Sequence, residues 1–145
     1  MTETADILTH LATAIMTKFS GSAFSTAING RLFQDDADGT DISEGMYAVF
    51  SVVSKVSGKT FSEEYANILL QLDIFSAASS SAEIKDAYTK AKALFDECTL
   101  TITGSTLVRM METNLVCMME EYTTTTGLQK VRHYAVDYET MTQYS

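Results

Sequence analysis

An acidic stretch in the first third of the chain comes nearest to a metal-binding motif. Asp36, Asp38 and Gly39 match the third, fifth and sixth positions of an EF-hand calcium loop. The first position would then be Gln34 and the twelfth Gly45, so the glutamate that completes such a loop is missing. We interpret the stretch as a solvated loop whose functional role would be contact with another protein. Its candidate contact residues are Asp35, Asp36, Asp38, Asp41 and Glu44.

The cysteines and histidines are the other candidates for chemistry. These residues are Cys98, Cys117, His10 and His133. Zinc needs three or four ligands that converge on one point, and these four show no close spacing. Cys117 and His133 could form a nucleophile and its base, but both fall on predicted strands without a turn that would present the thiol. We therefore predict buried reduced thiols and surface imidazoles, and no metal.

The sequence contains no motif for phosphate binding or acid-base catalysis either. The seven glycines occur singly, so neither a P-loop nor a dinucleotide fingerprint can be built. The pairs Glu63/Glu64 and Glu120/Glu121 consist of neighbours in sequence, and neighbours on a strand point to opposite faces. We interpret them as solvated charges. The sequence thus predicts no cofactor and no enzyme activity.

One predicted hairpin combines methionines with basic residues. The methionines are Met110, Met111, Met118 and Met119. Flexible thioethers suit an adaptable contact surface, although core packing is the favoured interpretation. Lys130 and Arg132 share a strand face and, with Arg109 on the neighbouring strand, could offset acidic residues across a subunit boundary. Simple surface charge balance is the alternative.

Composition limits the class of protein. At 145 residues, 46% hydrophobic and 20% charged, the chain fits one folded domain over residues 1–145. Its 10 basic and 19 acidic residues give a net charge of −9, which repels phosphate backbones and disfavours sequence-specific DNA binding. Apolar runs fall far short of the roughly 20 residues of a membrane span. Acidic residues near the start disfavour a signal peptide, so no membrane association and no export are expected.

Hydrophobic periodicity predicts the order of elements. Helical spacing covers residues 3–19, and a short strand near 31–33 lies within a long loop that spans 21–45. Two antiparallel strands follow at 46–53 and 65–75. A capping box at Ser80-Ser81-Ala82-Glu83 opens a second helix that ends near Asp96. The remainder is read as a strand at 100–103 and a long hairpin, with strands at 106–121 and 129–138 and a polar tip at 123–127.

This order predicts an α+β fold, with an antiparallel or mixed β-sheet and two main helices packed on one face. The clearest period of two places Ala66, Ile68, Leu70, Leu72 and Ile74 on one face of a strand.

Three segments carry a family resemblance. They are the strand from Tyr65 to Ser76, the helix from Ser81 to Phe95 and the Tyr-rich strand from His133 to Tyr138. In this order, after an amphipathic N-terminal helix, they resemble the tail terminator, or tail-completion, proteins of long-tailed, siphophage-like bacteriophages. The match in length and element order covers nearly the whole chain, although the family's usual proline before the first core strand is missing.

The resemblance implies a virion structural protein without enzyme activity. Its form would be a homo-oligomeric ring, typically hexameric, that caps the tail tube and provides the head-tail joining interface. The implied partners are further copies of the chain, the tail-tube protein and the head connector protein. DNA would only pass through the lumen, and the protein would be assembled in the host cytoplasm and reside at the tail-head junction.

Two other functions remain open at this stage. The chain could be another head-tail connector or tail-tube component, which would share the α+β plan but assemble differently. It could also be a small cytosolic ligand-binding domain, for which a deep pocket with His133 or Cys117 beside a carboxylate would be the evidence.

Overall fold

The described part of the chain folds into three helices and six strands. The computed structural model describes residues 7–36, 45–60, 62–124 and 127–144. In chain order the elements are α1 (Ile7–Phe19), α2 (Ala23–Ala27), β1 (Leu32–Gln34), β2 (Tyr47–Lys59), β3 (Glu64–Ser76), α3 (Ala82–Phe95), β4 (Thr101–Ile102), β5 (Ser105–Thr124) and β6 (Gly127–Tyr144). This confirms the predicted α+β class.

All six strands belong to one sheet in the order β1-β2-β3-β6-β5-β4. β1 runs parallel to β2, and every other neighbouring pair is antiparallel, so the sheet is mixed. The last strand, β6, lies between β3 and β5. Residues 65–76 of β3 pair with residues 132–143 of β6.

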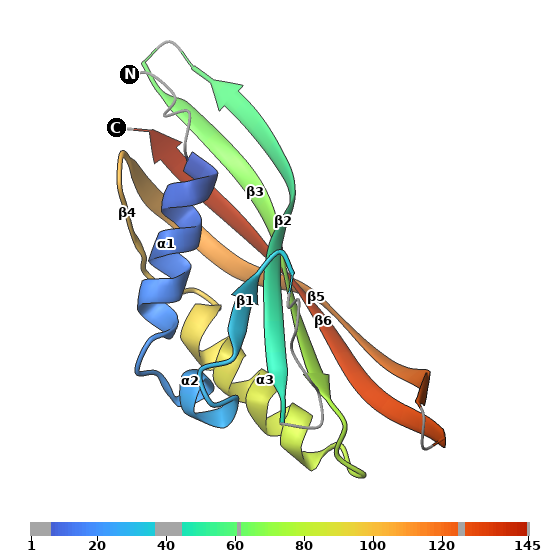
Figure 1. Cartoon of the computed structure of the whole chain (residues 1–145). Helices are drawn as coiled ribbons and strands as arrows, with labels where there is room; N and C mark the ends of the chain where they lie inside the picture. Colours follow the sequence, from blue (N-terminus) through green and yellow to red (C-terminus); the bar gives the residue numbers. More distant parts are fainter. Residues whose placement is uncertain (1–6, 37–44, 61, 125–126, 145) are drawn as a thin grey trace.

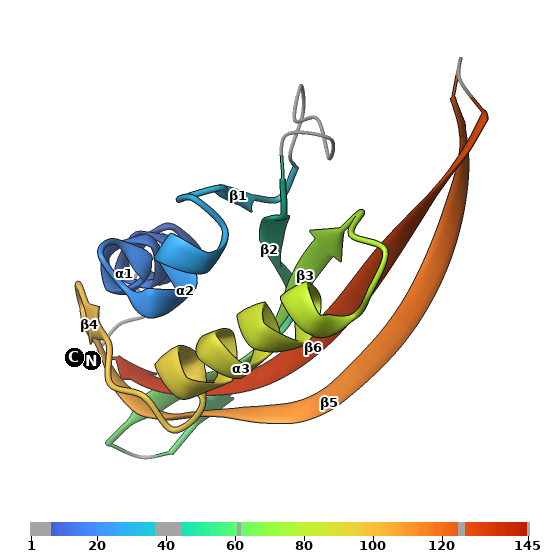
Figure 2. The same ribbon diagram turned by 90° about the horizontal axis from the view of Figure 1, so that it is seen from below.

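The helices cover the concave face of the curved sheet, as Figure 2 shows, and no described element covers the opposite face. We call that opposite face the outer face. The core lies between the helices and the sheet. It includes Leu11 and Ile15 of α1, Ile84 and Ala91 of α3, and Val136 of β6. Apolar residues at intervals of three and four turn one stripe of each helix toward the strands.

The predicted alternation in β3 is confirmed. Ala66, Ile68, Leu70, Leu72 and Ile74 are all buried, while the residues between them are partly exposed. Side chains on a strand point alternately to its two faces, so this pattern fixes which face of β3 meets the helices.

The sequence analysis missed α2, which lies inside the predicted long loop. Ser22 caps this helix, because its side-chain oxygen accepts a hydrogen bond from the Ser25 amide at 3.1 Å. Phe24 is fully buried and meets Phe19 and Phe95 edge to face, with ring centroids 5.5 Å and 6.3 Å away. Five residues are too few for periodicity to reveal a helix. The aromatic contacts hold it in place.

The capping box predicted at the start of α3 is wrong. Ser81 occupies the cap position and makes no side-chain capping bond. The Glu83 carboxylate instead accepts a hydrogen bond from the Ser76 hydroxyl at 2.5 Å. Ser76 is buried at the end of β3, so its hydroxyl needs an acceptor, and a carboxylate is a strong one.

The final hairpin is longer than predicted, with strands of 20 and 18 residues. β6 pairs with β3 only as far as Arg132, so residues 120–124 and 127–131 pair only with each other. We call these two segments the hairpin arm. The arm extends away from the rest of the molecule (Figure 1). Register shifts at Val108 and Thr113 of β5 lie nearer the body of the sheet.

Candidate functional site

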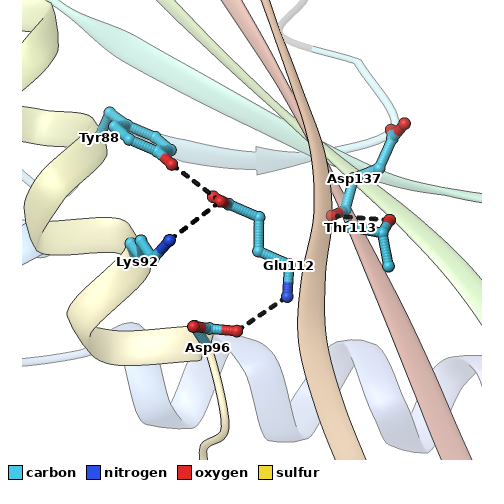
Figure 3. Close-up of polar contacts among 6 residues, drawn as sticks. All are labelled: Tyr88, Lys92, Asp96, Glu112, Thr113 and Asp137. Carbon is cyan, nitrogen blue, oxygen red and sulfur yellow. Dashed lines mark hydrogen bonds and ion pairs between the residues drawn. The ribbon is translucent and has the colours of Figure 1, made fainter.

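A polar cluster joins α3 to β5 (Figure 3). The Tyr88 hydroxyl donates to the Glu112 carboxylate at 2.8 Å, and the Lys92 ammonium contacts the same oxygen at 3.2 Å. The Glu112 amide donates to the Asp96 carboxylate at 2.8 Å. Burial, followed by the hydrogen bond and charge of Glu112, raises the pKa of Tyr88 to about 12. Tyr88 therefore remains a hydrogen-bond donor at neutral pH, and the cluster attaches the helix to the sheet.

A second cluster lies on the outer face and centres on His133. One ring nitrogen, Nε2, lies 2.7 Å from the Asp73 carboxylate, and the other, Nδ1, lies 2.9 Å from the Glu120 carboxylate. Phe75, the register partner of His133, takes no part in these bonds but stacks on the imidazole, with 4.3 Å between the ring centroids. Carboxylates only accept hydrogen bonds, so the imidazole must carry both protons to donate to each of them.

The charge of this imidazole is stabilised by its neighbours. Burial alone would lower the pKa of His133, since its side chain is only 14% exposed. The hydrogen bonds and charges of Asp73 and Glu120 outweigh burial and raise the pKa above its ordinary value. The result is a positive charge held between two negative ones, which joins β3, β6 and β5.

Three predictions about this region are wrong. His133 is not a surface imidazole, and Glu120 is not a simply solvated charge, because each contacts the other. Cys117, predicted to be buried, is exposed, although both thiols are free as expected. Cys117 lies opposite Tyr134 in the register and His133 lies opposite Met118, so the thiol and the imidazole occupy opposite faces of the hairpin. They do not form a nucleophile and base.

The outer face also carries a row of aromatic rings that sequence reasoning missed. Phe33 meets Tyr47 at 6.4 Å, and Tyr47 stacks on Phe75 at 4.9 Å, which in turn stacks on His133. The Arg31 guanidinium lies 5.8 Å from the centre of the Tyr47 ring. The row crosses β1, β2, β3 and β6. The available signal was that Phe75 alternates with the buried residues of its strand and must point outward.

Apolar side chains gather at the base of the hairpin arm and along it. Their exposed fractions are 43% for Val116, 38% for Met118, 48% for Met119 and 69% for Leu128. The preference for core packing holds for Met110, which is buried, and is wrong for Met118 and Met119. β5 continues beyond α3, so its distal residues have no helix to pack against.

The predicted acidic contact residues lie only partly within the described residues. Asp35 and Asp36 are exposed and directly follow β1. The Asp35 amide donates to the Phe50 carbonyl at 2.8 Å, which ties the start of the loop to β2. Asp38, Asp41 and Glu44 fall outside the residues that the structure describes.

The three basic residues do not lie together. The Arg109 guanidinium contacts the exposed Glu97 carboxylate through two nitrogens, within the same chain. Lys130 lies on the hairpin arm opposite Glu121, and Arg132 lies at its base opposite Met119. Arg109 is thus at the far end of the hairpin from the other two, where β5 faces Met141.

The two open grooves described here lie along α1 and have volumes of about 630 Å³ and 340 Å³. The larger is lined by Thr9, Ala12, Thr13, Met16, Thr17, Ser20 and Gln34. Within the described part of the chain, no three His, Cys, Asp or Glu residues are arranged to hold a metal ion. No helix described here is long and apolar enough to span a bilayer.

Comparison with known proteins finds similar structures. No protein-family model and no curated protein matches the chain. A chain from the virion of the native gene transfer agent (GTA) particle has a TM-score of 0.70 and 12% sequence identity. The match covers 97% of this chain and 99% of that one. A second solved protein matches with a TM-score of 0.55 and 13% identity over 96% of both chains.

These comparisons define the class of the protein by its fold. The helices, the mixed sheet and the long hairpin form an α+β arrangement that is shared, over nearly the full length, with a chain of the gene transfer agent virion. At such low identity the likeness concerns the fold alone.

Proposed function

We propose that this chain is a virion structural protein that acts as a tail terminator. In this role it forms a homo-oligomeric ring, hexameric in the form implied by the family resemblance, which caps the tail tube and provides the head-tail joining interface. The observation that carries the proposal is the nearly full-length structural likeness to a chain of the gene transfer agent virion. The sequence resemblance to tail terminators points independently to the same class.

The shape of the molecule supports a role in assembly. No described element covers the outer face of the sheet, and the hairpin arm projects beyond the body with exposed Leu128 on the arm and exposed Met119 at its base. Apolar side chains in such positions suit contact with other protein chains. The proposed partners are further copies of this chain, the tail-tube protein and the head connector protein.

The remaining features agree with a role that is not catalytic. Both nitrogens of His133 are occupied by carboxylates, and the Cys117 thiol lies on the other face of the hairpin. The net charge of −9 would let DNA pass through a ring lumen without adhering to it. No DNA sequence is recognised in this proposal. The protein would reside at the tail-head junction of the virion.

The test is assembly of the purified chain alone and with tail-tube protein from the same genome. We would measure mass across concentration by light scattering coupled to size exclusion, and image large species by negative stain. A closed ring of fixed copy number that binds one end of preformed tubes and stops their growth is the expected result. A matched control is tube protein incubated with bovine serum albumin.

Other outcomes separate the alternatives. Open filaments formed by this chain alone would identify a tube subunit, because a heterologous contact that does not close generates a helix. Binding to connectors but not to tubes would identify another connector component. A chain that binds neither tubes nor connectors would overturn the virion proposal.

A further inference from the structure

The sheet has two long strand edges without a pairing partner among the described residues. β1 pairs with β2 only at Ala48–Phe50, so residues 51–59 of β2 have no described strand beside them on that side. On the other side, β4 pairs with β5 only at residues 105 and 106. The segment after α3 contacts β5 through Met110 and Glu112, which leaves 114–124 open. An unpaired edge presents a row of backbone donors and acceptors to any other strand.

Both open segments also expose apolar side chains. On β2, Val53 and Val56 are 53% and 64% exposed. On β5, Val116 is 43% exposed and Met119 is 48% exposed. Soluble proteins usually protect long apolar edges with charges, bulges or a covering element, and β2 has one register shift at Val53. Beyond that shift its residues remain in continuous register with β3 through Lys59.

The topology fixes the relative direction of the two edges. β2 is antiparallel to β3, β3 to β6 and β6 to β5, so β2 and β5 run in opposite directions. If a second copy lies beside the first in the same orientation, its β2 is antiparallel to the first copy's β5. Neighbouring copies can therefore continue one antiparallel sheet.

Charge favours contact between unlike edges. Within 51–59 of β2, both charged residues are basic, Lys55 and Lys59. Within residues 114–124 of β5, both are acidic: Glu120, which is bonded to His133 of its own chain, and Glu121, which is exposed. Lys59 contacts Glu64 of its own chain yet remains 74% exposed. Either edge paired with its own copy across a two-fold axis would bring like charges together, whereas β2 against β5 brings opposite charges together.

We infer that copies of this chain associate head to tail, by antiparallel pairing of the β5 edge (114–124) of one copy with the β2 edge (51–59) of the next. Ser51 and Asn114 lie at the same level of the sheet, because Ser51 pairs with Gln71, Gln71 with Asp137, and Asp137 with Asn114. From this level β2 and β5 run in opposite directions, so the two open segments lie toward opposite ends of the sheet. Neighbours must therefore be staggered along the strands, as strands are in closed barrels. The hairpin arm then lies over the adjacent copy. This inference concerns self-association and does not depend on a role in virions.

The test uses one charge-bearing variant on each edge. The glutamate introduced by Val56→Glu would face the acidic β5 segment of the neighbouring copy. The lysine introduced by Val116→Lys would face the basic β2 segment of the other neighbour. Each should weaken self-association at least tenfold in sedimentation velocity across a concentration series. Leu8→Glu is the matched control, since Leu8 is 38% exposed and belongs to α1 rather than to either strand edge. It should associate like the unmodified chain. Circular dichroism and thermal unfolding verify that each variant is folded.

Mixing the two edge variants gives the sharper result. Each variant keeps one unmodified edge, and the two new charges are opposite, so the mixture should associate more tightly than either variant alone. A two-fold interface through β2 or through β5 would instead be weakened by only one of the variants.

Three results would overturn this inference. They are a chain that remains monomeric at all concentrations, edge variants that associate like the control, and a mixture no tighter than its components. Rings that persist in both edge variants would reject the edge pairing while leaving the tail-terminator proposal intact. Conversely, head-to-tail association without tube or connector binding would support the pairing and reject the virion role.

Discussion

At the scale of single residues, the protonation of His133 couples the outer-face cluster to pH. Its positive charge is shared between Asp73 and Glu120, and loss of the proton leaves two carboxylates beside a ring that can donate to only one of them. The cluster joins three strands at the base of the hairpin arm. It therefore affects the stability of the region from which the arm projects.

We predict that the folded state loses stability as the pH rises from 6.5 through the pKa of His133 in the folded protein. The pKa of His133 is raised in the folded protein, so its contribution is complete below the ordinary value of 6.5 and is lost as the pH rises through the folded-state pKa. His133→Gln should lower the free energy of unfolding at pH 6 by about 2 kcal/mol, the scale of hydrogen bonds to charged groups. Urea denaturation between pH 6 and 9 measures both effects. His10→Gln is the control, and an equal pH profile in the two variants would contradict the prediction.

Residue-level predictions from sequence succeeded where burial follows periodicity. The inward residues of β3, such as Ile68 and Leu72, were identified because alternation is a local property. The His133 cluster could not be found in this way. Its carboxylates come from strands that lie far apart in the chain, and only the register brings Asp73 and Glu120 to the same ring.

At the scale of elements, the attachment of α3 to β5 depends on one carboxylate. The Glu112 carboxylate accepts hydrogen bonds from Tyr88 and Lys92 of the helix, and the Glu112 amide donates to Asp96 at the helix end. Near this point, the Thr113 hydroxyl donates to the Asp137 carbonyl at 3.4 Å, beside the register shift (Figure 3).

Glu112→Ala should destabilise the fold by about 2 kcal/mol, because it leaves the partly buried Tyr88 hydroxyl without its acceptor. Glu121→Ala removes an exposed acid from the same strand and should change stability by less than about 0.5 kcal/mol. Urea denaturation of both variants at pH 7 measures the difference. Equal midpoints would show that the cluster in Figure 3 does not hold the helix to the sheet.

Most elements were predictable because they are long. α1, α3 and β3 extend over 13, 14 and 13 residues, so each repeats its pattern several times. β2 was predicted only as far as residue 53, although it continues to Lys59, because its second half is polar. α2 was missed because its five residues carry no period and depend on contacts of Phe24 with distant rings. The capping box failed for a similar reason, since the Ser76 hydroxyl competes for Glu83.

At the scale of the whole molecule, the hairpin arm is separable from the fold. Glu121 and Lys130 lie directly opposite each other, so two residues can connect them. Replacing residues 122–129 with Asn-Gly gives a short turn suited to an antiparallel hairpin and keeps the Glu120 contact with His133.

This shortened chain should remain folded and associate more weakly than the full chain. It loses exposed Leu128 and the end of the open β5 edge, but none of the residues that pack beneath the helices. Thermal unfolding and sedimentation velocity test the two parts of the prediction. A control that keeps the arm and replaces Leu128 with Ala should fall between the full and shortened chains. Unchanged association after shortening would remove the arm from the interface.

The overall class, α+β with a mixed sheet and helices on one face, was predictable from element order. The projection of the arm was not, because sequence gives strand length without showing where the neighbouring strand ends. That information resides in the pairing of β3 with β6, which stops at Ser76 and Arg132.

The central position of β6 also governs when the sheet can be completed during synthesis. β3 emerges from the ribosome well before β6. Until β6 is synthesised, the edge of β3 that will pair with it has no native partner, and the apolar side chains along that edge are not fully covered. Non-local pairing of this kind slows folding, typically to milliseconds or seconds. The nascent chain is therefore a natural client for chaperones, and we expect its yield of native protein to depend on how quickly this last strand inserts.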